Sequence, residues 1–429
     1  MITLFLFKSN VKGIRYGIGT YIKQLTKSLS NYNYRIFVVD YFSNKNKEFS
    51  EITVSPSHKE LLIPIPIRFE MNDKNSIIYG KRIVDCLVDY IDKNSTPIFI
   101  FNYSCSVFIA RQLKARFSAP IISIVHLAEW QYPFMGNKQK LIQFWKIYKK
   151  GQVTEIKELD NERELFELSD RIVSVTSYMK DFLCSYYKIP PSKILVIQNG
   201  ICSSDFQIYN KQTKDRLKKQ LGFKSNEKIV LFTGRADLVK GLHFLIESFK
   251  KVTSKNKNVR LIIIGELAGF DKICQHLSQF EEICSKITFT GYLVYEKVLM
   301  FYQIADIGIL PSIYDHCPYT ALEMIGHNIP LIISNTEGLN EVLTDRQSVY
   351  LNPIYDSEGN ISFDTNEIAE AILTLVNNKE KIKQITKDYK YLTRDKFSSK
   401  RMAEEMNNLF LTLADRFNMN PEYKKNERR

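Results

Sequence analysis

The 429-residue sequence predicts an α/β protein built from two doubly wound parallel sheets, each in a Rossmann-like domain. Short apolar strand segments alternate with amphipathic helical segments along the chain, and the chain is too long for one core of ordinary size. A polar stretch, Ser203–Glu227, separates two such series. We therefore expect domains at residues 1–205 and 206–395, a helix at 396–417 that crosses back to the first domain, and a tail at 418–429.

In the first domain, strands are predicted where β-branched apolar runs reach strand length, and helices where apolar residues recur every three or four positions. Near-continuous apolar character indicates strands that are buried on both faces, as in a parallel sheet. The predicted strands are Ile2–Phe7, Arg35–Asp40, Ile98–Phe101, Ile121–His126, Arg171–Thr176 and Ile194–Gln198, and the predicted helices are Gly19–Ser30, Ser76–Lys93, Ser106–Arg116 and Ser177–Tyr187.

The second domain repeats the same alternation of buried strand and amphipathic helix. Its predicted strands are Lys228–Thr233, Arg260–Gly265, Ile287–Thr290, Ile307–Leu310 and Leu331–Ser334, and its predicted helices are Gly241–Ser254, Val294–Ile304, Tyr319–Gly326 and Ile368–Asn377. The last helical segment is Ser399–Phe417.

The composition is that of a globular protein, with 44% hydrophobic and 25% charged residues. Apolar runs fall far below the ~20 residues of a membrane span, and the first residues predict a β-strand rather than a signal peptide. The seven cysteines are scattered without C-x-x-C spacing, which favours a reducing compartment. We therefore expect a cytoplasmic protein, with peripheral attachment to the cytoplasmic face of the membrane as a variant of that expectation.

The net charge of +13 is uneven, because residues 1–205 hold 28 basic and 19 acidic side chains. Such an excess predicts negatively charged partners: nucleotide phosphates, lipid-linked phosphates or an anionic membrane face. Nucleic acid is not expected, because the sequence has no recognition-helix, zinc-knuckle or arginine-rich pattern.

The segment Pro311–Met324 carries two carboxylates, Asp315 and Glu323, eight positions apart. A buried strand ends before it, a loop holds Asp315, and a helix begins near Tyr319. This order predicts that both carboxylates face the crevice at the carboxyl ends of a parallel sheet, where open α/β folds bind ligands. Two acceptor groups there suit a ligand dense in hydroxyls, such as a sugar and a ribose.

Two basic residues follow another predicted strand. Arg235 comes directly after Gly234, and Lys240 stands before Gly241, where the next helix begins. The free N–H groups of a helix N-terminus favour anions, and an Arg fork with a Lys point charge would clamp a diphosphate. The alternative is that both residues are solvated loop charges.

Weaker features lie at other predicted strand ends. Gly17 and Gly19 open the first helix, Gly265 ends a buried strand, Tyr292 follows another strand, and His126 closes a strand in the first domain. A tight turn explains the glycines and Tyr292 as well as a ligand does. A lone His at a strand end is an ordinary structural residue or points into a site.

Four segments of the chain together resemble glycosyltransferase family 4. The carboxylate segment resembles that family's E-x7-E signature, with Asp315 in place of the first Glu, and GRADLVKG matches its G-R-x(4)-K-G diphosphate motif. The glycine segment at Gly17 resembles the family's N-terminal loop, and Asn199-Gly200 matches the element that closes its first domain. The resemblance implies the GT-B fold, in which two Rossmann-like domains face each other across a cleft.

The same resemblance implies a retaining transfer of a sugar from a nucleotide-diphosphate sugar to an acceptor hydroxyl, in the synthesis of cell-surface glycans or glycoconjugates. The cationic side chains would replace a metal ion, so neither a metal nor a further cofactor is expected. The implied catalytic residues are His126, Asp315, Arg235 and Lys240, and the implied donor-binding residues are Gly17, Gly19, Gly234, Arg235, Lys240, Gly265, Tyr292, Asp315, Tyr319, Thr320, Ala321 and Glu323.

Several alternatives remain open at this point. The same scaffold hosts nucleotide-sugar epimerases, and a binding protein without catalysis is a further reading. The donor base and sugar, the oligomeric state and the acceptor, whether glycan, lipid-linked saccharide or peptide, are not determined by the sequence. The helical segment Lys138–Lys150, with apolar residues on one face and lysines around it, would lie on an anionic membrane or pack on its own domain.

Overall fold

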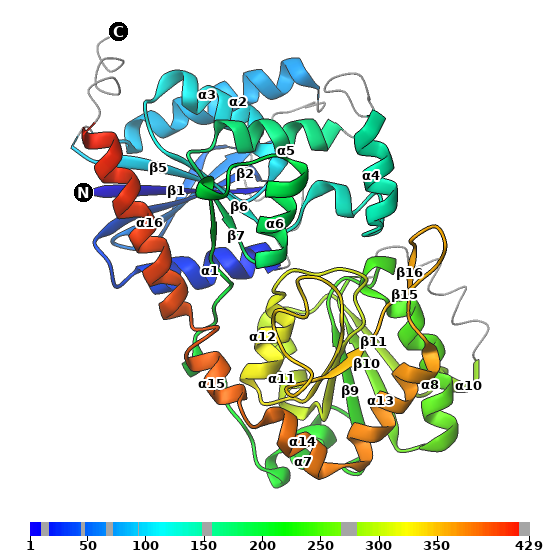
Figure 1. Cartoon of the computed structure of the whole chain (residues 1–429). Helices are drawn as coiled ribbons and strands as arrows, with labels where there is room; N and C mark the ends of the chain where they lie inside the picture. The colour runs from blue at the N-terminus through cyan, green and yellow to red at the C-terminus, as the bar shows by residue number, and fades with distance from the viewer. Residues whose placement is uncertain are drawn as a thin grey trace. The chain divides into compact units, whose positions relative to one another are not determined.

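The computed structural model describes residues 1–9, 17–43, 48–65, 72–92, 94–147, 157–266 and 281–419. The chain divides into two compact units, each with a sheet between helices (Figure 1). Unit 1 comprises Met1–Glu129, Ile147–Gly200 and Ser399–Arg429, and unit 2 comprises Trp130–Lys146 and Ile201–Ser398. The predicted α/β class with doubly wound parallel sheets is confirmed.

In unit 1 the strands lie in the order β3-β4-β2-β1-β5-β6-β7-β8. β3 is antiparallel to β4, and the other neighbours are parallel. The strands are β1 (Ile2–Ser9), β2 (Tyr34–Ser43), β3 (Ser50–Ser55), β4 (His58–Pro64), β5 (Thr96–Phe101), β6 (Ile121–Val125), β7 (Arg171–Ser174) and β8 (Ile194–Val196).

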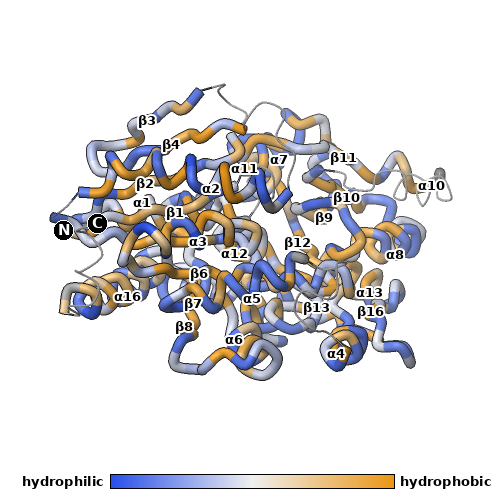
Figure 2. Tube along the Cα trace, turned by 90° about the horizontal axis from the view of Figure 1, so that it is seen from above, coloured by the Kyte–Doolittle hydropathy of each residue, from blue (hydrophilic) through white to orange (hydrophobic). Residues whose placement is uncertain are grey.

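Helices cover both faces of this sheet. Helix α3 packs between α2 and α5, and α1 packs on α16, on the opposite face (Figure 1). Hydrophobic and hydrophilic residues alternate along the helices (Figure 2), and in α1 the apolar residues Tyr21, Ile22, Leu25 and Leu29 are buried, as in an amphipathic helix. The helices are α1 (Gly17–Leu29), α2 (Asp73–Leu87), α3 (Val107–Arg116), α5 (Lys157–Leu168), α6 (Ser177–Tyr186) and α16 (Ser399–Met419).

Unit 2 has a parallel sheet in the order β11-β10-β9-β12-β13-β14 and a separate antiparallel pair, β15-β16. Its strands are β9 (Lys228–Thr233), β10 (Val259–Ile264), β11 (Ile287–Gly291), β12 (Ile307–Leu310), β13 (Leu331–Ser334), β14 (Val349–Leu351), β15 (Ile354–Tyr355) and β16 (Ile361–Ser362). Its helices are α4 (Lys138–Ile147), α7 (Lys211–Gln220), α8 (Leu242–Lys255), α10 (Glu281–Cys284), α11 (Tyr295–Ile304), α12 (Tyr319–Gly326), α13 (Thr365–Asn377), α14 (Lys379–Thr386) and α15 (Tyr389–Arg394).

The division of the chain differs from the predicted domains at the boundary, where unit 2 begins at Ile201 and not at residue 206, and in one further segment. Trp130–Lys146, which the sequence placed within residues 1–205, belongs to unit 2. Its Asn137 side chain donates to the Glu358 carbonyl at 2.9 Å and to Asn360 Oδ1 at 3.1 Å. Such long-range polar contacts have no local sequence signal, which is why the prediction missed them.

Two local predictions also differ from the structure. The polar stretch Ser203–Glu227 contains α7, which Asn210 caps by accepting a hydrogen bond from the Thr213 N–H at 3.0 Å. The hairpin β3–β4 was not predicted, because β3 is exposed along most of its length and shows no buried apolar pattern. β3 and α7 lie at the surface, where hydrophobic periodicity is weak, whereas β4 buries Leu61, Leu62 and Ile63 and its apolar run was not used in the prediction.

Helix α16 lies in unit 1. Asn407 Oδ1 accepts a hydrogen bond from the Tyr34 hydroxyl at 2.6 Å, and the Phe410 ring meets the Tyr34 ring edge-on. Arg401 donates to the carbonyl of Gln198 at 2.6 Å. Within the described part of the chain, no helix combines the length and the apolar character that crossing a bilayer requires.

A buried ion pair joins α7 to the sheet of unit 2. The Lys218 side chain is 4% exposed, and its ammonium donates to Asp306 Oδ2 at 2.7 Å and to the carbonyl of Glu227 at 2.8 Å. The same carboxylate oxygen accepts from the Ile229 N–H at 2.9 Å. Asp306 therefore holds the start of β9 to the start of β12.

We predict that Lys218→Met lowers the free energy of unfolding of unit 2 by about 1–3 kcal/mol, because the substitution leaves the Asp306 carboxylate and the Glu227 carbonyl short of a donor. The measurement is the urea midpoint of the full chain. Lys219→Met, at the exposed neighbouring position, is the control and should leave the midpoint unchanged. Equal midpoints for both variants would contradict the structural role of the pair.

Candidate functional site

The candidate site of unit 2 lies where three neighbouring parallel strands end. β10, β9 and β12 are adjacent, so that their carboxyl ends meet at one edge of the sheet. Gly265 follows β10, Gly234 and Arg235 follow β9, and Pro311 follows β12. This is the edge at which open α/β sheets bind ligands.

Two glycines at this edge are required by close backbone packing. Gly265 has φ +149°, and a Cβ there would lie 1.8 Å from the Gly234 carbonyl oxygen. Gly241 has φ +67°, and a Cβ there would lie 1.9 Å from the Pro311 carbonyl oxygen. Any side chain at these two positions would collide with backbone, so the strand ends and loops can approach each other only with glycine.

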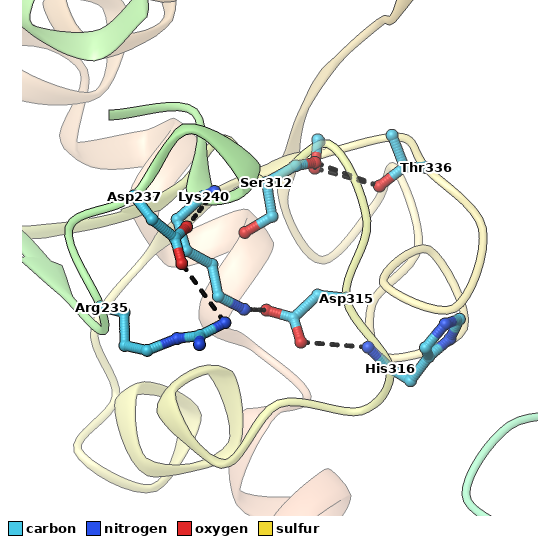
Figure 3. Close-up of polar contacts among 8 residues, drawn as sticks. Arg235, Asp237, Lys240, Ser312, Asp315, His316 and Thr336 are labelled. Carbon is cyan, nitrogen blue, oxygen red and sulfur yellow. Dashed lines mark hydrogen bonds and ion pairs between the residues drawn. The ribbon is translucent and has the colours of Figure 1, made fainter. Parts of the chain in front are cut away.

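Charged side chains converge on the same edge (Figure 3). Lys240 Nζ lies 2.5 Å from Asp315 Oδ2, and Arg235 Nη2 lies 3.3 Å from Asp237 Oδ2. Asp237 also accepts a hydrogen bond from the Lys240 backbone N–H at 3.1 Å. The structure thus brings together the predicted residues Arg235, Lys240 and Asp315, and it adds Asp237. The spacing of Asp237, three residues before Lys240, is that of an N-cap, a signal that the prediction did not use.

The Lys240 and Asp315 side chains are 22% and 16% exposed, and Arg235 is 37% exposed. Both cations are therefore open to solvent while they stay within reach of a carboxylate. Ion pairs of this kind stabilise a fold by little, because solvent screens them. Little free energy is therefore needed to rearrange them when an anion binds.

The loop from Pro311 to Asp315 is fastened on two sides. The Ile313 N–H donates to the Val239 carbonyl at 2.8 Å, which joins this loop to the residue before Lys240. The Ser312 carbonyl accepts hydrogen bonds from the hydroxyls of Ser334 and Thr336. These bonds hold the loop between the ends of β9 and β13.

Next to Asp315, His316 connects the loop to the segment Trp130–Lys146. Its Nε2 lies 2.8 Å from Gln131 Oε1, and its backbone N–H donates to Asp315 Oδ1 at 3.1 Å. Gly338 lies directly against the ring, since a Cβ there would be 2.2 Å from His316 Nδ1. His316 was not among the predicted site residues, because a His beside a motif carries no pattern of its own.

Glu323, the second carboxylate of the motif, has partners of its own. It lies in α12, is 6% exposed, and accepts a hydrogen bond from the Tyr302 hydroxyl at 2.8 Å. Burial raises the pKa of Tyr302, and the Glu323 carboxylate raises it further. Burial also raises the pKa of Tyr295, and the charges of Glu323 and Asp205 and a hydrogen bond to Glu323 raise it further. Asp315 and Glu323 thus sit in different surroundings, one against a lysine and one against tyrosines.

The remaining predicted residues of unit 2 flank this edge. Tyr319, Thr320 and Ala321 form the first turn of α12, where Tyr319 and Ala321 are buried and Thr320 is half-buried. Tyr292 follows β11 and is 47% exposed. Tyr292 thus lies in a turn, and the other three residues lie at the start of a helix. These structural roles alone would explain the four residues without a ligand.

The other predicted residues lie in unit 1. Helix α1 begins at Gly17 and contains Gly19, whereas the segment before it, residues 10–16, lies outside the described residues. His126 follows β6, and its Nε2 lies 3.0 Å from Asn102 Oδ1. Burial lowers the pKa of His126 to about 3, so the imidazole is neutral at neutral pH. Its ring packs edge-on against the Tyr21 ring, with 4.7 Å between the ring centroids.

The predicted amphipathic helix Lys138–Lys150 is described as α4, which ends at Ile147; residues 148–150 lie outside the described residues. Leu141 is buried, Lys138 forms an ion pair with Glu337, and Lys140 donates to Asn360 at 2.9 Å. These contacts hold Leu141 and the two lysines within unit 2, and membrane binding by the helix stays a prediction. Among the described residues, no group of three or more His, Cys, Asp or Glu side chains could hold a metal ion.

Two family models match the chain. Residues 213–391 match the model "Glycosyl transferases group 1", and residues 16–204 match the model "Glycosyltransferase Family 4". Together they span most of both units.

Individual relatives are distant. The chain is 25% identical over 236 residues to an uncharacterized glycosyltransferase of Methanocaldococcus jannaschii, over 51% of this chain and 59% of that protein. It is 26% identical over 263 residues to the lipopolysaccharide 1,2-N-acetylglucosaminetransferase of Salmonella typhimurium, over 58% of this chain and 65% of that protein. The matches thus span less than two thirds of either relative.

Among solved structures, Anabaena HepE in complex with UDP-glucose superimposes on this chain with a TM-score of 0.71 at 14% sequence identity. The superposition covers 96% of this chain and 100% of the HepE chain. At this identity the likeness concerns the fold alone, and it shows that the chain has the GT-B fold.

The buried His316 predicts a pH dependence of stability. Burial lowers its pKa to about 4; Asp315 and Glu337 oppose this shift, and Lys240 adds to it. A His in the unfolded chain has a pKa of about 6.5, so the unfolded chain binds the proton at a higher pH than the folded one. The free energy of unfolding therefore falls as the pH drops from about 6.5 towards 4, by at most about 1.4 kcal/mol per pH unit.

We predict that His316→Gln, whose amide reaches Gln131 without titrating, flattens this dependence. The measurement is the urea midpoint across the same pH range for wild type and variant. A residual slope is expected from His327, whose pKa burial also lowers to about 4, and from His126, whose pKa burial lowers to about 3. Parallel curves for the two proteins would show that His316 does not stay neutral in the folded state.

Proposed function

Because the chain belongs to the group 1 glycosyl transferases of glycosyltransferase family 4, we propose that it transfers a sugar from a nucleotide-diphosphate sugar to an acceptor hydroxyl. The observation that carries the proposal is the convergence of Arg235 and Lys240 at the carboxyl edge of the unit 2 sheet. Two partly exposed cations at this edge would bind an anion such as a diphosphate.

In the proposed reaction, Arg235 and Lys240 bind the diphosphate and stabilise the negative charge that develops on it as the glycosidic bond breaks. The Arg guanidinium supplies two parallel donors, whereas the Lys ammonium supplies a point charge. Backbone N–H groups of Tyr319 and Thr320, in the first turn of α12, add donors at a helix N-terminus, whereas the Ala321 N–H donates to the Pro318 carbonyl at 3.0 Å. No divalent cation is needed in this scheme, because the two side chains supply the positive charge.

The carboxylates take the hydroxyl-bearing parts of the donor. Glu323 accepts hydrogen bonds from the ribose, oriented by the Tyr302 hydroxyl that contacts it. Asp315 contacts hydroxyls of the transferred sugar and also positions Lys240, its ion-pair partner. Since Asp is one methylene shorter than the Glu of the family signature, its reach toward the sugar is reduced, which bears on the choice of sugar.

The other predicted residues take lesser roles in the proposal. Gly234 and Gly265 let the backbone approach the nucleotide, and Tyr292 borders the base. Gly17 and Gly19 belong to the N-terminal glycine loop on the donor side. His126 faces the transferred sugar as a neutral hydrogen-bonding group, consistent with its lowered pKa. The anomeric configuration is retained, as the family resemblance implies.

For the acceptor, we propose a glycan, a lipid-linked saccharide or a peptide in the synthesis of cell-surface glycoconjugates. The Salmonella relative is named for lipopolysaccharide, and residues 1–205 carry a net positive charge that suits an anionic acceptor or membrane face. The proposed location is the cytoplasm, with peripheral contact to the membrane where the acceptor is lipid-linked.

We predict that one of UDP, GDP and ADP raises the melting temperature of the wild-type chain, and that Arg235→Ala and Lys240→Ala each remove this shift. Sugar transfer should fall by roughly 100-fold or more in each variant, because each loses a charge that stabilises the leaving group. Calorimetry with the three nucleotides, followed by product analysis with the matching nucleotide sugars, gives both quantities.

Two further variants sharpen this experiment. Arg235→Lys keeps the charge but loses the fork, and should retain part of the binding. Lys219→Ala removes an exposed lysine remote from the motif and should behave as wild type. Wild-type transfer in Arg235→Ala or Lys240→Ala would overturn the diphosphate assignment, and an epimerised donor without transfer would favour the epimerase reading.

We also predict that EDTA leaves the transfer rate unchanged, since the cationic side chains supply the charge that a divalent ion would otherwise provide. The rate is measured before and after chelation, with Mg²⁺ and Mn²⁺ added back. A rate that collapses with EDTA and recovers with either metal would disprove the metal-independent scheme.

A further inference from the structure

Two buried hydroxyl groups on the Pro311–Asp315 loop have no role in the site as described so far. Ser312 is 1% exposed and Tyr314 is 6% exposed. Among the residues that the structure describes, neither Ser312 Oγ nor Tyr314 Oη has a hydrogen-bond partner. A buried hydroxyl without a partner costs free energy, and Ala and Phe would fill the same space without that cost.

Packing explains the Tyr314 ring but not its hydroxyl. The ring belongs to the apolar core of unit 2, and a Cβ at Gly136 would lie 3.0 Å from its Cδ1 atom. A phenylalanine would make the same contacts. The hydroxyl therefore needs a reason beyond the fold.

The loop that carries both hydroxyls lies beside the charged cluster. Ile313, which stands between them in the sequence, donates its N–H to the carbonyl of Val239, so that this loop lies against the turn that carries Lys240. In Figure 3 the Ser312 side chain turns toward Lys240 and Asp237, whereas its carbonyl faces Thr336 on the other side.

The surroundings of Tyr314 point to the same cluster. Burial raises the pKa of its phenol, the charge of Asp237 raises it further, and the Arg235 guanidinium opposes the shift. The phenol thus lies within electrostatic reach of the Arg235–Asp237 pair and remains a neutral hydrogen-bond donor at neutral pH.

We propose that the Ser312 and Tyr314 hydroxyls donate hydrogen bonds to the diphosphate oxygens of the nucleotide sugar. The inference rests on the proposed function, because it assigns these hydroxyls to the same anion as Arg235 and Lys240. A hydroxyl bound to a charged acceptor forms one of the stronger hydrogen bonds in proteins, so an anion would offset the cost of burying both groups. Ser312 and Tyr314 then act as binding residues beside the two cations.

The test compares Ser312→Ala and Tyr314→Phe with wild type in two measurements, the melting temperature without nucleotide and the Kd for UDP, GDP and ADP. For the nucleotide that binds wild type, each variant should raise the Kd by roughly 10-fold, the loss of one hydrogen bond to a charged group. The melting temperature without nucleotide should stay unchanged or rise, because the variant no longer buries a polar group without a partner.

Tyr389→Phe is the matched control in the same unit. Tyr389 is fully buried, and its hydroxyl donates to the Gln347 carbonyl at 2.8 Å. Removing this hydroxyl should lower the melting temperature and leave the Kd for nucleotide unchanged. Tyr314→Phe should therefore change the Kd without lowering the melting temperature, whereas Tyr389→Phe should lower the melting temperature without changing the Kd.

Four results would overturn the inference. If Tyr314→Phe lowers the melting temperature as Tyr389→Phe does and leaves the Kd unchanged, the hydroxyl serves the fold. If the Kd rises for the nucleotide sugar but not for the nucleoside diphosphate, the hydroxyls contact the sugar and not the diphosphate. If wild type binds none of the three nucleotides or their sugars, the proposed function fails and the inference fails with it, whereas unchanged binding in both variants refutes the inference alone.

Discussion

The site of unit 2 depends on the contact between the backbone of Gly241 and the backbone of Pro311. Only a residue without a Cβ permits this approach, since a Cβ on Gly241 would lie 1.9 Å from the Pro311 carbonyl oxygen. The contact presses the turn after β9 against the loop after β12, and Lys240 and Asp315, one from each, then meet as an ion pair. Without it, the two halves of the sequence motif would remain separate loops.

The electrostatics of the cluster follow from this geometry. Each cation of the site has a carboxylate beside it, Asp315 for Lys240 and Asp237 for Arg235, and all four side chains are at least partly exposed. Solvent screening keeps such pairs weak, so a doubly charged anion can compete for the cations at small cost. In the proposed reaction the carboxylates therefore orient the cations and do not block them.

The two carboxylates of the motif differ in their surroundings more than their spacing in the sequence suggests. Glu323 is buried in α12 and is held by the Tyr302 hydroxyl, as a rigid acceptor should be. Asp315 lies at a loop, in contact with Lys240 and with the N–H of its neighbour His316. The Asp315 carboxylate is bound to a cation, and its side chain is shorter than the Glu of the family signature, so it would contact a sugar differently. We therefore expect this chain to differ from its relatives in sugar preference.

The sequence by itself determined the α/β class, most of the strands and the cationic motif, because these depend on local periodicity and on the spacing of a few residues. Buried parallel strands such as Lys228–Thr233 are apolar throughout, and β9 begins and ends at the predicted residues. Surface elements such as β3 and α7 escaped prediction, since they bury too few side chains to show a period.

Only the tertiary structure decided which groups stand next to each other. The Lys240–Asp315 pair, the Tyr302–Glu323 hydrogen bond and the placement of Trp130–Lys146 in unit 2 join residues far apart along the chain. No local pattern encodes such contacts, because they arise from strand order and from the close approach that glycine permits. The buried hydroxyls of Ser312 and Tyr314 belong to this class as well: in the sequence they are ordinary residues of a motif, and only burial without a partner sets them apart.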